Sequence, residues 1–179
     1  MMEMNEPPAT GLSRARAALL AAAAGYAVLV VYQAYTLPDR VPGQIGPGGE
    51  VARWSDRPTH VLMACLAGLG LFLAMWFAPR LIGRLPVEAV NLPHRDYWLR
   101  PENLPRTRGM IADDMGWFGA ATIAFVGFAL DQVGRVAAGQ PGFSGAFWAV
   151  LVTYLVGALG WALWSTVGGR WKPPPHPFG

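Results

Sequence analysis

Four apolar stretches, separated by polar and proline-rich segments, occupy most of the chain. They run approximately over residues 17–37, 59–77, 115–135 and 147–167. A bilayer hydrocarbon core of about 30 Å requires roughly 20 consecutive apolar residues in a helix, and a helix satisfies its own backbone amides in lipid. The apolar positions fill whole segments rather than one helical face. The pattern therefore predicts an all-α membrane protein with four transmembrane helices in an antiparallel bundle.

The distribution of basic residues predicts the orientation of this bundle. Ten Lys and Arg residues fall in the N-terminal segment, the second connection and the tail, whereas the first and third connections hold four. Because cytoplasmic segments carry the excess of basic residues, we expect an N-in/C-in topology. The basic residues flank the spans and form no patch with stacking aromatic residues, so nucleic acid is not an expected partner.

The expected organisation is one membrane domain with short ends. Residues 1–16 form a cytoplasmic N-terminal segment, residues 17–168 the four-span domain, and residues 169–179 a Pro-rich cytoplasmic tail. Within the domain, an outer loop covers residues 38–58 and a cytoplasmic loop residues 79–114. The first apolar run is longer than a signal-peptide core of roughly 7–15 residues, so we interpret it as a retained anchor.

Small residues recur at a spacing of four within three of the spans. Such faces allow helix backbones to approach closely in a membrane, although an Ala- and Gly-rich chain also shows this spacing by chance. The hypothesis is that the spans associate through these faces. The sets are Ala17, Ala21 and Gly25; Gly116, Ala120 and Ala124; and Ala158 with Ala162.

The outer loop is rich in proline, glycine and balanced charge, which excludes a long regular element. Two interpretations are open: a structured cap held by ion pairs, or a recognition surface for an external peptide or protein. The residues that define its motif are Pro38, Asp39, Arg40, Pro42, Gly49, Glu50, Arg53, Trp54 and Arg57.

These residues, in this order, resemble a bacterial membrane domain of unknown function that forms the front part of SdpI-type toxin-immunity proteins. The domain also occurs in shorter four-span proteins, and the resemblance covers about residues 20–78. Where the family often has a histidine, this chain has Gln44, and it has no second SdpI-type membrane domain. The resemblance implies a multi-pass protein of the bacterial cytoplasmic (inner) membrane.

The cytoplasmic loop contains a second motif that is similar to one in the shorter four-span proteins. Its prolines exclude one continuous helix but allow a short helix after Pro101 or Pro105. Tyr97 and Trp98 are expected to enter the membrane interface, and docking of a partner is the alternative. The motif residues are Asn91, Pro93, Tyr97, Trp98, Pro101 and Glu102.

Charged residues at the ends of the third span form the last group of candidates. Asp113 and Asp114 directly precede the span, where a helix dipole favours acidic groups. Asp131 and Arg135 lie four residues apart at its other end, with Gln132 between them, a spacing that favours a helix-surface pair. Charge at membrane depth is costly and typical of functional sites, so a ligand or solute pathway is the alternative to an interfacial pair.

The sequence offers no nucleophile–base pair, phosphate loop or metal-ligand spacing, and its one cysteine, Cys65, lies within the second span. We therefore expect no enzyme activity, no cofactor and no metal. The favoured function is a small binding or accessory membrane protein that contacts membrane-protein partners or an external peptide through its two loops. The alternative is a channel- or transporter-like protein that uses Asp131, Gln132 and Arg135. The bilayer is the remaining expected partner.

Overall fold

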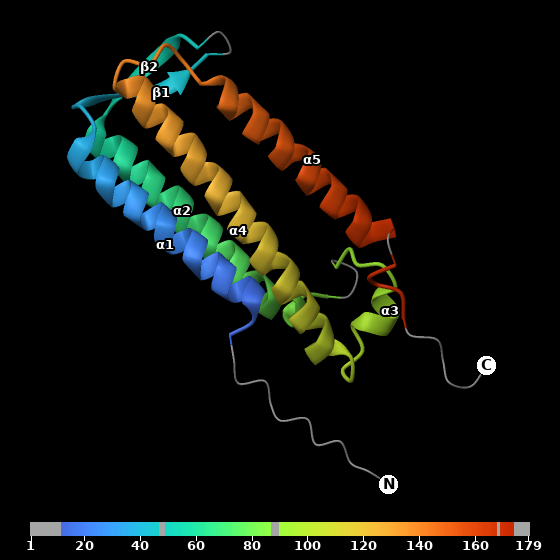
Figure 1. Ribbon diagram of the computed structural model, residues 1–179. Helices are drawn as coiled ribbons and strands as arrows, with labels where there is room; N and C mark the ends of the chain where they lie inside the picture. Colours follow the sequence, from blue (N-terminus) through green and yellow to red (C-terminus); the bar gives the residue numbers. More distant parts are fainter. Residues whose placement is uncertain (1–11, 47–48, 87–89, 168, 174–179) are drawn as a thin grey trace.

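A computed structural model describes residues 12–46, 49–86, 90–167 and 169–173 of the chain (Figure 1). Four helices in this part are long and apolar enough to cross a membrane: α1 (Arg14–Thr36), α2 (Arg57–Leu81), α4 (Leu104–Ala137) and α5 (Gly145–Val167). The prediction of four apolar helices of membrane-spanning length is confirmed, and such helices are typical of a multi-pass membrane protein. The shorter elements are strands β1 (Arg40–Ile45) and β2 (Val51–Asp56), a 3₁₀ turn η1 (Ile82–Arg84) and helix α3 (Arg95–Trp98).

Each of the four helices begins before its predicted span, because groups outside the apolar runs stabilise the first turns. The Ser13 hydroxyl caps α1 by accepting a hydrogen bond from the Arg16 amide at 3.3 Å. Helix α4 begins at Leu104 with Pro105 in its first turn, a position where proline is favoured. The prediction that Asp113 and Asp114 start this helix is therefore wrong, since both lie well inside it.

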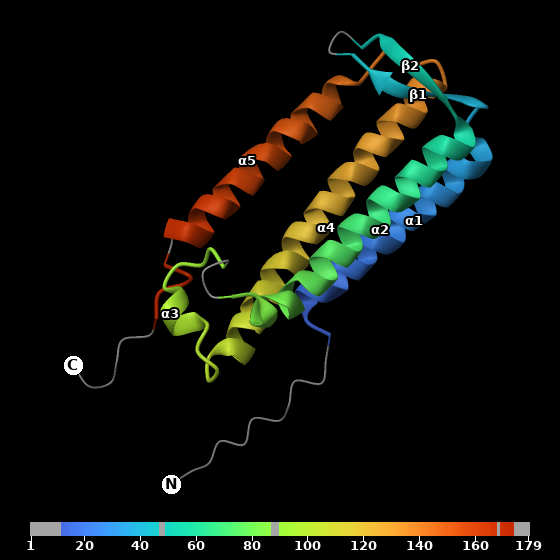
Figure 2. The ribbon, with the colours of Figure 1, turned by 180° about the vertical axis from the view of Figure 1, so that it is seen from behind.

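Helices α1, α2 and α4 lie side by side, whereas α5 is set apart from them along most of its length (Figures 1 and 2). A buried apolar cluster joins the three packed helices. It contains Leu19, Tyr26, Val30, Ala64 and Ile123. The middle of this three-helix unit is therefore held together by apolar contacts.

The helix backbones approach each other closely at only some of the small residues that were expected to form packing faces. A methyl group added to Gly116 would lie 2.8 Å from the carbonyl carbon of Ala15. The backbones of α1 and α4 therefore approach each other there more closely than a side chain at position 116 would allow. By contrast Ala17, Ala21 and Gly25 are exposed, and nothing lies within 4 Å of a methyl group added to Gly25. The prediction that these three residues form a packing face is wrong, because α1 presents its larger side chains to its neighbours instead.

The two ends of the protein have different structures. At one, called here the hairpin end, β1 and β2 form an antiparallel hairpin between α1 and α2, beside the α4–α5 loop (Figure 1). This two-stranded sheet is a departure from the predicted all-α fold. At the other, the α3 end, α3 lies beside the segment that follows α5 (Figure 2).

A buried tryptophan pair holds the α3 end together. The Trp98 indole is 2 % exposed and donates from Nε1 to the Trp171 carbonyl at 2.7 Å. The Thr107 hydroxyl donates to the Trp98 carbonyl, also at 2.7 Å. Trp98 thus packs inside the protein. The prediction that it enters the membrane interface is wrong. Trp171, in the expected tail, is buried too, while residues 174–179 of that tail lie outside the described residues.

Candidate functional site at the hairpin end

The hairpin buries two residues of β1 and no residue of β2. In β1, Val41 is fully buried and Pro42 is also buried, whereas in β2 residues 52–54 are exposed. Pro42 lies opposite Trp54, and the register shifts between Pro42 and Gln44. Because proline has no amide hydrogen to donate to the ladder, such an irregularity is where a strand tolerates it. As a result, the hairpin exposes Arg53 and Trp54 on the surface of the protein.

Arg57 fixes the base of this hairpin. Its Nη1 donates to the Leu37 carbonyl at 2.9 Å, and its Nη2 contacts the Asp39 carboxylate at 3.2 Å. Its backbone amide also donates to the Asp39 carbonyl at 3.0 Å. One arginine therefore ties the end of α1 and the start of β1 to the start of α2. This ion pair is part of the structured cap that the loop charges predicted.

Asp56 caps α2 directly beneath the hairpin. Its Oδ1 accepts a hydrogen bond from the Thr59 amide at 2.7 Å, the usual arrangement of an N-cap carboxylate. This backbone hydrogen bond lowers the pKa of Asp56 below its ordinary value, because the bond favours the ionised form. The carboxylate therefore stabilises the hairpin–α2 junction in its charged state.

The tip of the hairpin touches the α4–α5 loop at two glycines. Gly49 has a φ of 89° and Gly142 a φ of 81°, a region that glycine adopts without steric cost. A methyl group added to Gly142 would lie 2.9 Å from the Gly49 Cα, and one added to Gly49 would lie 3.2 Å from the Gly142 Cα. The hairpin is therefore held at its tip as well as at its base.

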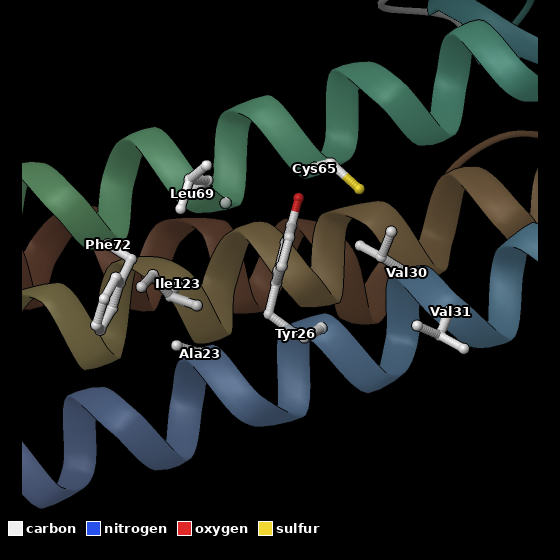
Figure 3. Close-up of a pocket in the computed structure, with 10 residues that line it drawn as sticks. Ala23, Tyr26, Val30, Val31, Cys65, Leu69, Phe72 and Ile123 are labelled. Atoms are coloured by element: carbon white, nitrogen blue, oxygen red, sulfur yellow. The ribbon is translucent and has the colours of Figure 1, made fainter.

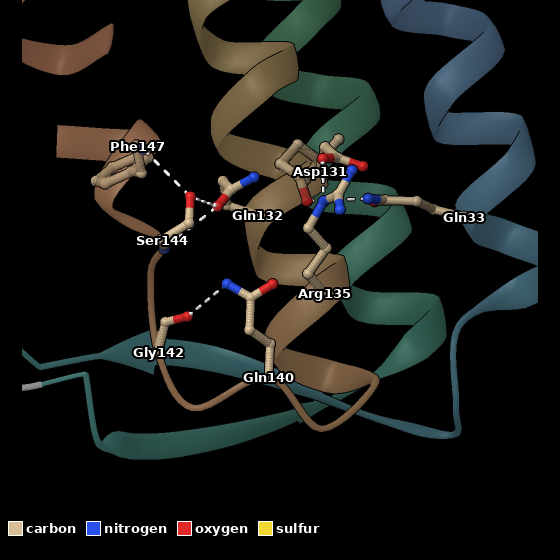
Figure 4. Close-up of polar contacts among 9 residues, drawn as sticks. Gln33, Asp131, Gln132, Arg135, Gln140, Gly142, Ser144 and Phe147 are labelled. Carbon is tan, nitrogen blue, oxygen red and sulfur yellow. Dashed lines mark hydrogen bonds and ion pairs between the residues drawn. The ribbon is translucent and has the colours of Figure 1, made fainter. Parts of the chain in front are cut away.

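A mixed polar and apolar pocket of about 340 Å³ lies between α1 and α4 at this end; we call it the hairpin-end pocket. Figure 4 shows the Gln33 side chain reaching from α1 toward α4 beside Asp131 and Arg135. The Arg135 Nε donates to Asp131 Oδ2 at 2.7 Å. The pocket is lined by Tyr32, Gln33, Thr36, Leu37, Pro38, Asp131, Gly134, Arg135 and Ala138.

Gln33 forms the buried floor of this pocket. It is 3 % exposed, its Nε2 donates to the Leu130 carbonyl at 2.9 Å, and its Oε1 lies 3.4 Å from His60 Nε2. A methyl group added to Gly134 would lie 2.9 Å from Gln33 Nε2, so the amide would have to shift to accommodate it. This contact was missed from the sequence, although a lone glutamine in an apolar run is the kind of residue that requires a partner.

The predicted polar residues of α4 have two different surroundings. The Asp131–Arg135 pair lies at the pocket rim, and both side chains reach solvent-accessible surface. Gln132 is buried and faces away from the pocket, where its Oε1 accepts from the Ser144 hydroxyl at 2.7 Å (Figure 4). The Ser144 hydroxyl in turn accepts from the Phe147 amide at 3.3 Å. Gln132 therefore anchors the start of α5 and does not join the ion pair.

The two sequence motifs lie at opposite ends of the protein. Of the outer-loop motif, the structure brings Asp39 and Arg57 into contact and places Arg53 and Trp54 on the exposed strand. Of the cytoplasmic-loop motif, Trp98 is buried, Tyr97 and Pro93 are partly buried, and the remaining residues are exposed. Those remaining residues are Asn91, Pro101 and Glu102.

One ion pair at the α3 end was not predicted. Arg170 contacts the buried Asp114 carboxylate, with an Nη2–Oδ1 distance of 2.5 Å. It joins α4 to the segment after α5, 56 positions along the chain. The sequence identified Asp114 but gave no indication of its partner, because such a pairing depends on how the helices pack.

Between the two ends, α1 and α2 form an apolar pocket of about 350 Å³ that is open at the surface. Tyr26, Cys65 and Phe72 are among its lining residues (Figure 3). The Tyr26 hydroxyl donates to the Ala64 carbonyl at 2.8 Å, which satisfies its polar group. The described part of the chain thus has an apolar centre, and its exposed polar chemistry is concentrated at the ends.

Metal binding and similarity to known proteins give no further indication of function. Among the described residues, no three His, Cys, Asp or Glu side chains gather closely enough to hold a metal ion. No protein-family model matches the chain, and the comparisons with curated proteins and with solved structures also gave no match.

Proposed function

We propose that this protein is a small binding or accessory protein of the bacterial inner membrane that docks a partner on its hairpin end. The partner is another membrane protein or an external peptide. In this proposal the four spans form an antiparallel bundle with both termini in the cytoplasm, which places the hairpin outside. The excess of basic residues at the α3 end supports this orientation. The sequence resemblance to the SdpI-type membrane domain supports the bacterial location.

The observation that carries the proposal is the hairpin, which is held firmly but presents an exposed tryptophan. Trp54 is 49 % exposed and lies beside the exposed Arg53, and tryptophan and arginine are enriched among residues that dominate binding energy. Arg57 holds the hairpin base, and the contact between Gly49 and Gly142 holds its tip. A surface fixed in this way loses little conformational freedom on binding.

An extended segment of the partner fits this surface best. The described sheet has two strands, so each leaves one edge without a strand partner. An extended peptide can add to such an edge through backbone hydrogen bonds, with side-chain pockets giving specificity. The hairpin-end pocket lies at the same end, and its rim carries a negative charge on Asp131 and a positive charge on Arg135.

A solute pathway receives less support from the structure. The Asp131–Arg135 pair lies at the end of α4, and Gln132 is occupied by Ser144. A pathway needs polar groups through the membrane centre, where the buried cluster around Tyr26 and Ile123 is apolar.

The test is copurification from native membranes, with variants that change the exposed strand. We expect the double variant Arg53→Ala/Trp54→Ala to lose a stoichiometric partner protein while membrane insertion and thermal stability stay unchanged. The matched control is Tyr35→Ala, which removes another highly exposed aromatic side chain at the same end. Retention of the same partner by the double variant contradicts docking on the hairpin, and loss in the control as well contradicts its specificity.

A further inference from the structure

Helix α5 leaves an open groove along α4. Of the 23 residues of α5, only Phe147 in its first turn is buried. Figures 1 and 2 both show α5 separated from the three packed helices along its middle. In most membrane proteins neighbouring helices associate by close packing, so this separation requires a physical cause.

The cause is an aromatic spacer in the middle of the groove. The rings of Phe125 and Tyr154 stack with centroids 4.6 Å apart, and the Tyr154 hydroxyl lies 2.9 Å from the Thr122 hydroxyl. These large side chains hold α5 away from α4. Small residues on both sides of the spacer, including Ala121 and Gly157, then leave the space unfilled.

Two cavities occupy the groove, one on each side of this spacer. The cavity toward the α3 end measures about 310 Å³ and is lined by Trp117, Phe118, Ala158 and Trp161 among others. The other measures about 400 Å³ and includes Phe128 and Val150. The Tyr154 hydroxyl is paired with Thr122, and the Thr153 hydroxyl donates to the Ala149 carbonyl at 2.8 Å. Water is therefore a poor occupant, because it needs several polar partners.

We propose that the cavity toward the α3 end binds one acyl chain of a glycerophospholipid. An apolar space without atoms forfeits dispersion contacts along its walls, so an apolar occupant is required. A helix of another protein has a diameter of about 10–12 Å, and the Phe125–Tyr154 spacer obstructs an object of that width. An acyl chain is narrow and flexible enough to follow the walls up to the spacer.

Polar groups at the α3 end match the rest of the lipid. Ser165 continues the helical row of Tyr154, Ala158 and Trp161 by one turn, so it lies just beyond the cavity lining toward the α3 end. Its hydroxyl is buried and has no hydrogen-bond partner among the residues that the structure describes. Rotated toward the groove, this hydroxyl would donate to an ester carbonyl of the lipid.

The charge beyond Ser165 suits a phosphate group. Arg170 and the exposed Lys172 follow α5 in this region, and Arg170 lies 5.4 Å from the Trp164 ring centroid. Asp114 neutralises Arg170 in part, and the exposed Lys172 adds a second positive charge. Tryptophan and basic side chains together are typical of the headgroup level of a membrane.

The experiment measures the phospholipid that stays bound to the full chain after purification in mild detergent, by native mass spectrometry. The protein is first reconstituted into vesicles of phosphatidylglycerol and phosphatidylethanolamine, which are the lipid probes, and is then extracted again in mild detergent. Gly157→Leu fills the cavity, and Gly160→Leu is the matched control on the same helix. Neither glycine has an atom within 4 Å of an added methyl group, so both variants have room to fold.

We expect one phospholipid per chain in the unmodified protein and in Gly160→Leu. Gly157→Leu should retain about tenfold less, a ratio that corresponds to about 1.4 kcal/mol. Ser165→Ala should also lower retention, whereas its neighbour Thr166→Ala should not, because the Thr166 hydroxyl already donates to the Ala162 carbonyl. These two variants keep the test valid even if Gly157→Leu misfolds.

Three results would overturn the proposal. The first is an unmodified chain that retains no phospholipid. The second is equal retention in Gly157→Leu and Gly160→Leu, with Ser165→Ala unchanged. The third is a lipid-free dimer that Gly157→Leu converts to a monomer, which would assign the groove to a second copy of the chain. None of these results depends on whether a partner docks on the hairpin.

Discussion

Gly116 is the position where a single methyl group should disturb the packing of the spans most directly. A methyl group there would lie 2.7 Å from the Ala15 Cβ, 2.8 Å from its carbonyl carbon and 2.9 Å from its oxygen. Two of these atoms belong to the α1 backbone, which cannot rotate away as a flexible side chain would. The variant Gly116→Ala therefore forces α1 and α4 apart.

The magnitude follows from two opposing effects. Overpacking a well-packed site costs about 1–3 kcal/mol, and a backbone contact belongs at the upper end of that range. Replacing glycine by alanine inside a helix contributes about 1 kcal/mol in the opposite direction. We expect Gly116→Ala to lower the free energy of unfolding by about 1–2 kcal/mol. Gly109→Ala, on the same helix with nothing within 4 Å, should raise it by up to about 1 kcal/mol.

The assay is reversible unfolding in mixed micelles, followed by far-ultraviolet circular dichroism as the denaturing detergent fraction rises. The two variants should shift the midpoint in opposite directions from that of the unmodified protein. If Gly116→Ala is as stable as Gly109→Ala, then the backbones of α1 and α4 do not approach closely at Gly116, and the helix packing described above is wrong.

Three further variants test the ends of the protein. Trp98→Phe removes the donor to the Trp171 carbonyl and should cost about 1–3 kcal/mol, which faster proteolysis of the segment around Trp171 would reveal. Gly142→Ala, at positive φ and against Gly49, should cost about 1–2 kcal/mol, measured by the same unfolding assay. Asp56→Asn should destabilise the protein at neutral pH, and the deficit should shrink as the pH falls below the ordinary value of 3.8. The sign follows because the folded pKa is lowered, so the unmodified protein loses this contribution on protonation; a deficit that is constant with pH would contradict it.

The spans could be predicted from the sequence because a run of apolar residues has few alternatives in a membrane protein. Their ends could not, since the bilayer sets the length of the apolar run but not that of the helix. Helix α4 has 34 residues, or roughly 50 Å at 1.5 Å per residue, against a hydrocarbon core of about 30 Å. Its first turns, from Leu104, are polar and were assigned to a loop.

The hairpin was only partly predictable, because Pro42 and Gly43 are residues that normally interrupt strands. The structure accommodates both at the shift of register opposite Trp54 and Arg53. The alternation of acidic and basic residues suggested a cap with ion pairs, and the described residues of the hairpin show one such pair, between Asp39 and Arg57. It gave no pairing, because the register depends on the positions at which α1 ends and α2 begins.

Contacts between distant segments were the least predictable part of the candidate site. Gln33 and Leu130 are separated by 97 positions, and Trp98 and Trp171 by 73. Spacing within one helix identifies neighbours such as Asp131 and Arg135, but it does not indicate which face meets another helix.

The most direct test of partner docking on the hairpin is photo-crosslinking in native membranes. A benzophenone amino acid placed at the exposed Ala52 samples the exposed strand and leaves Trp54 in place, and one placed at the exposed Val152 of α5 samples the lipid-facing surface. We expect position 52 to yield one dominant crosslinked protein, and an excess of the unmodified chain to compete this crosslink away. We expect position 152 to yield no dominant crosslink. Equal crosslinking at both positions, or none at position 52, would contradict a binding function of the hairpin.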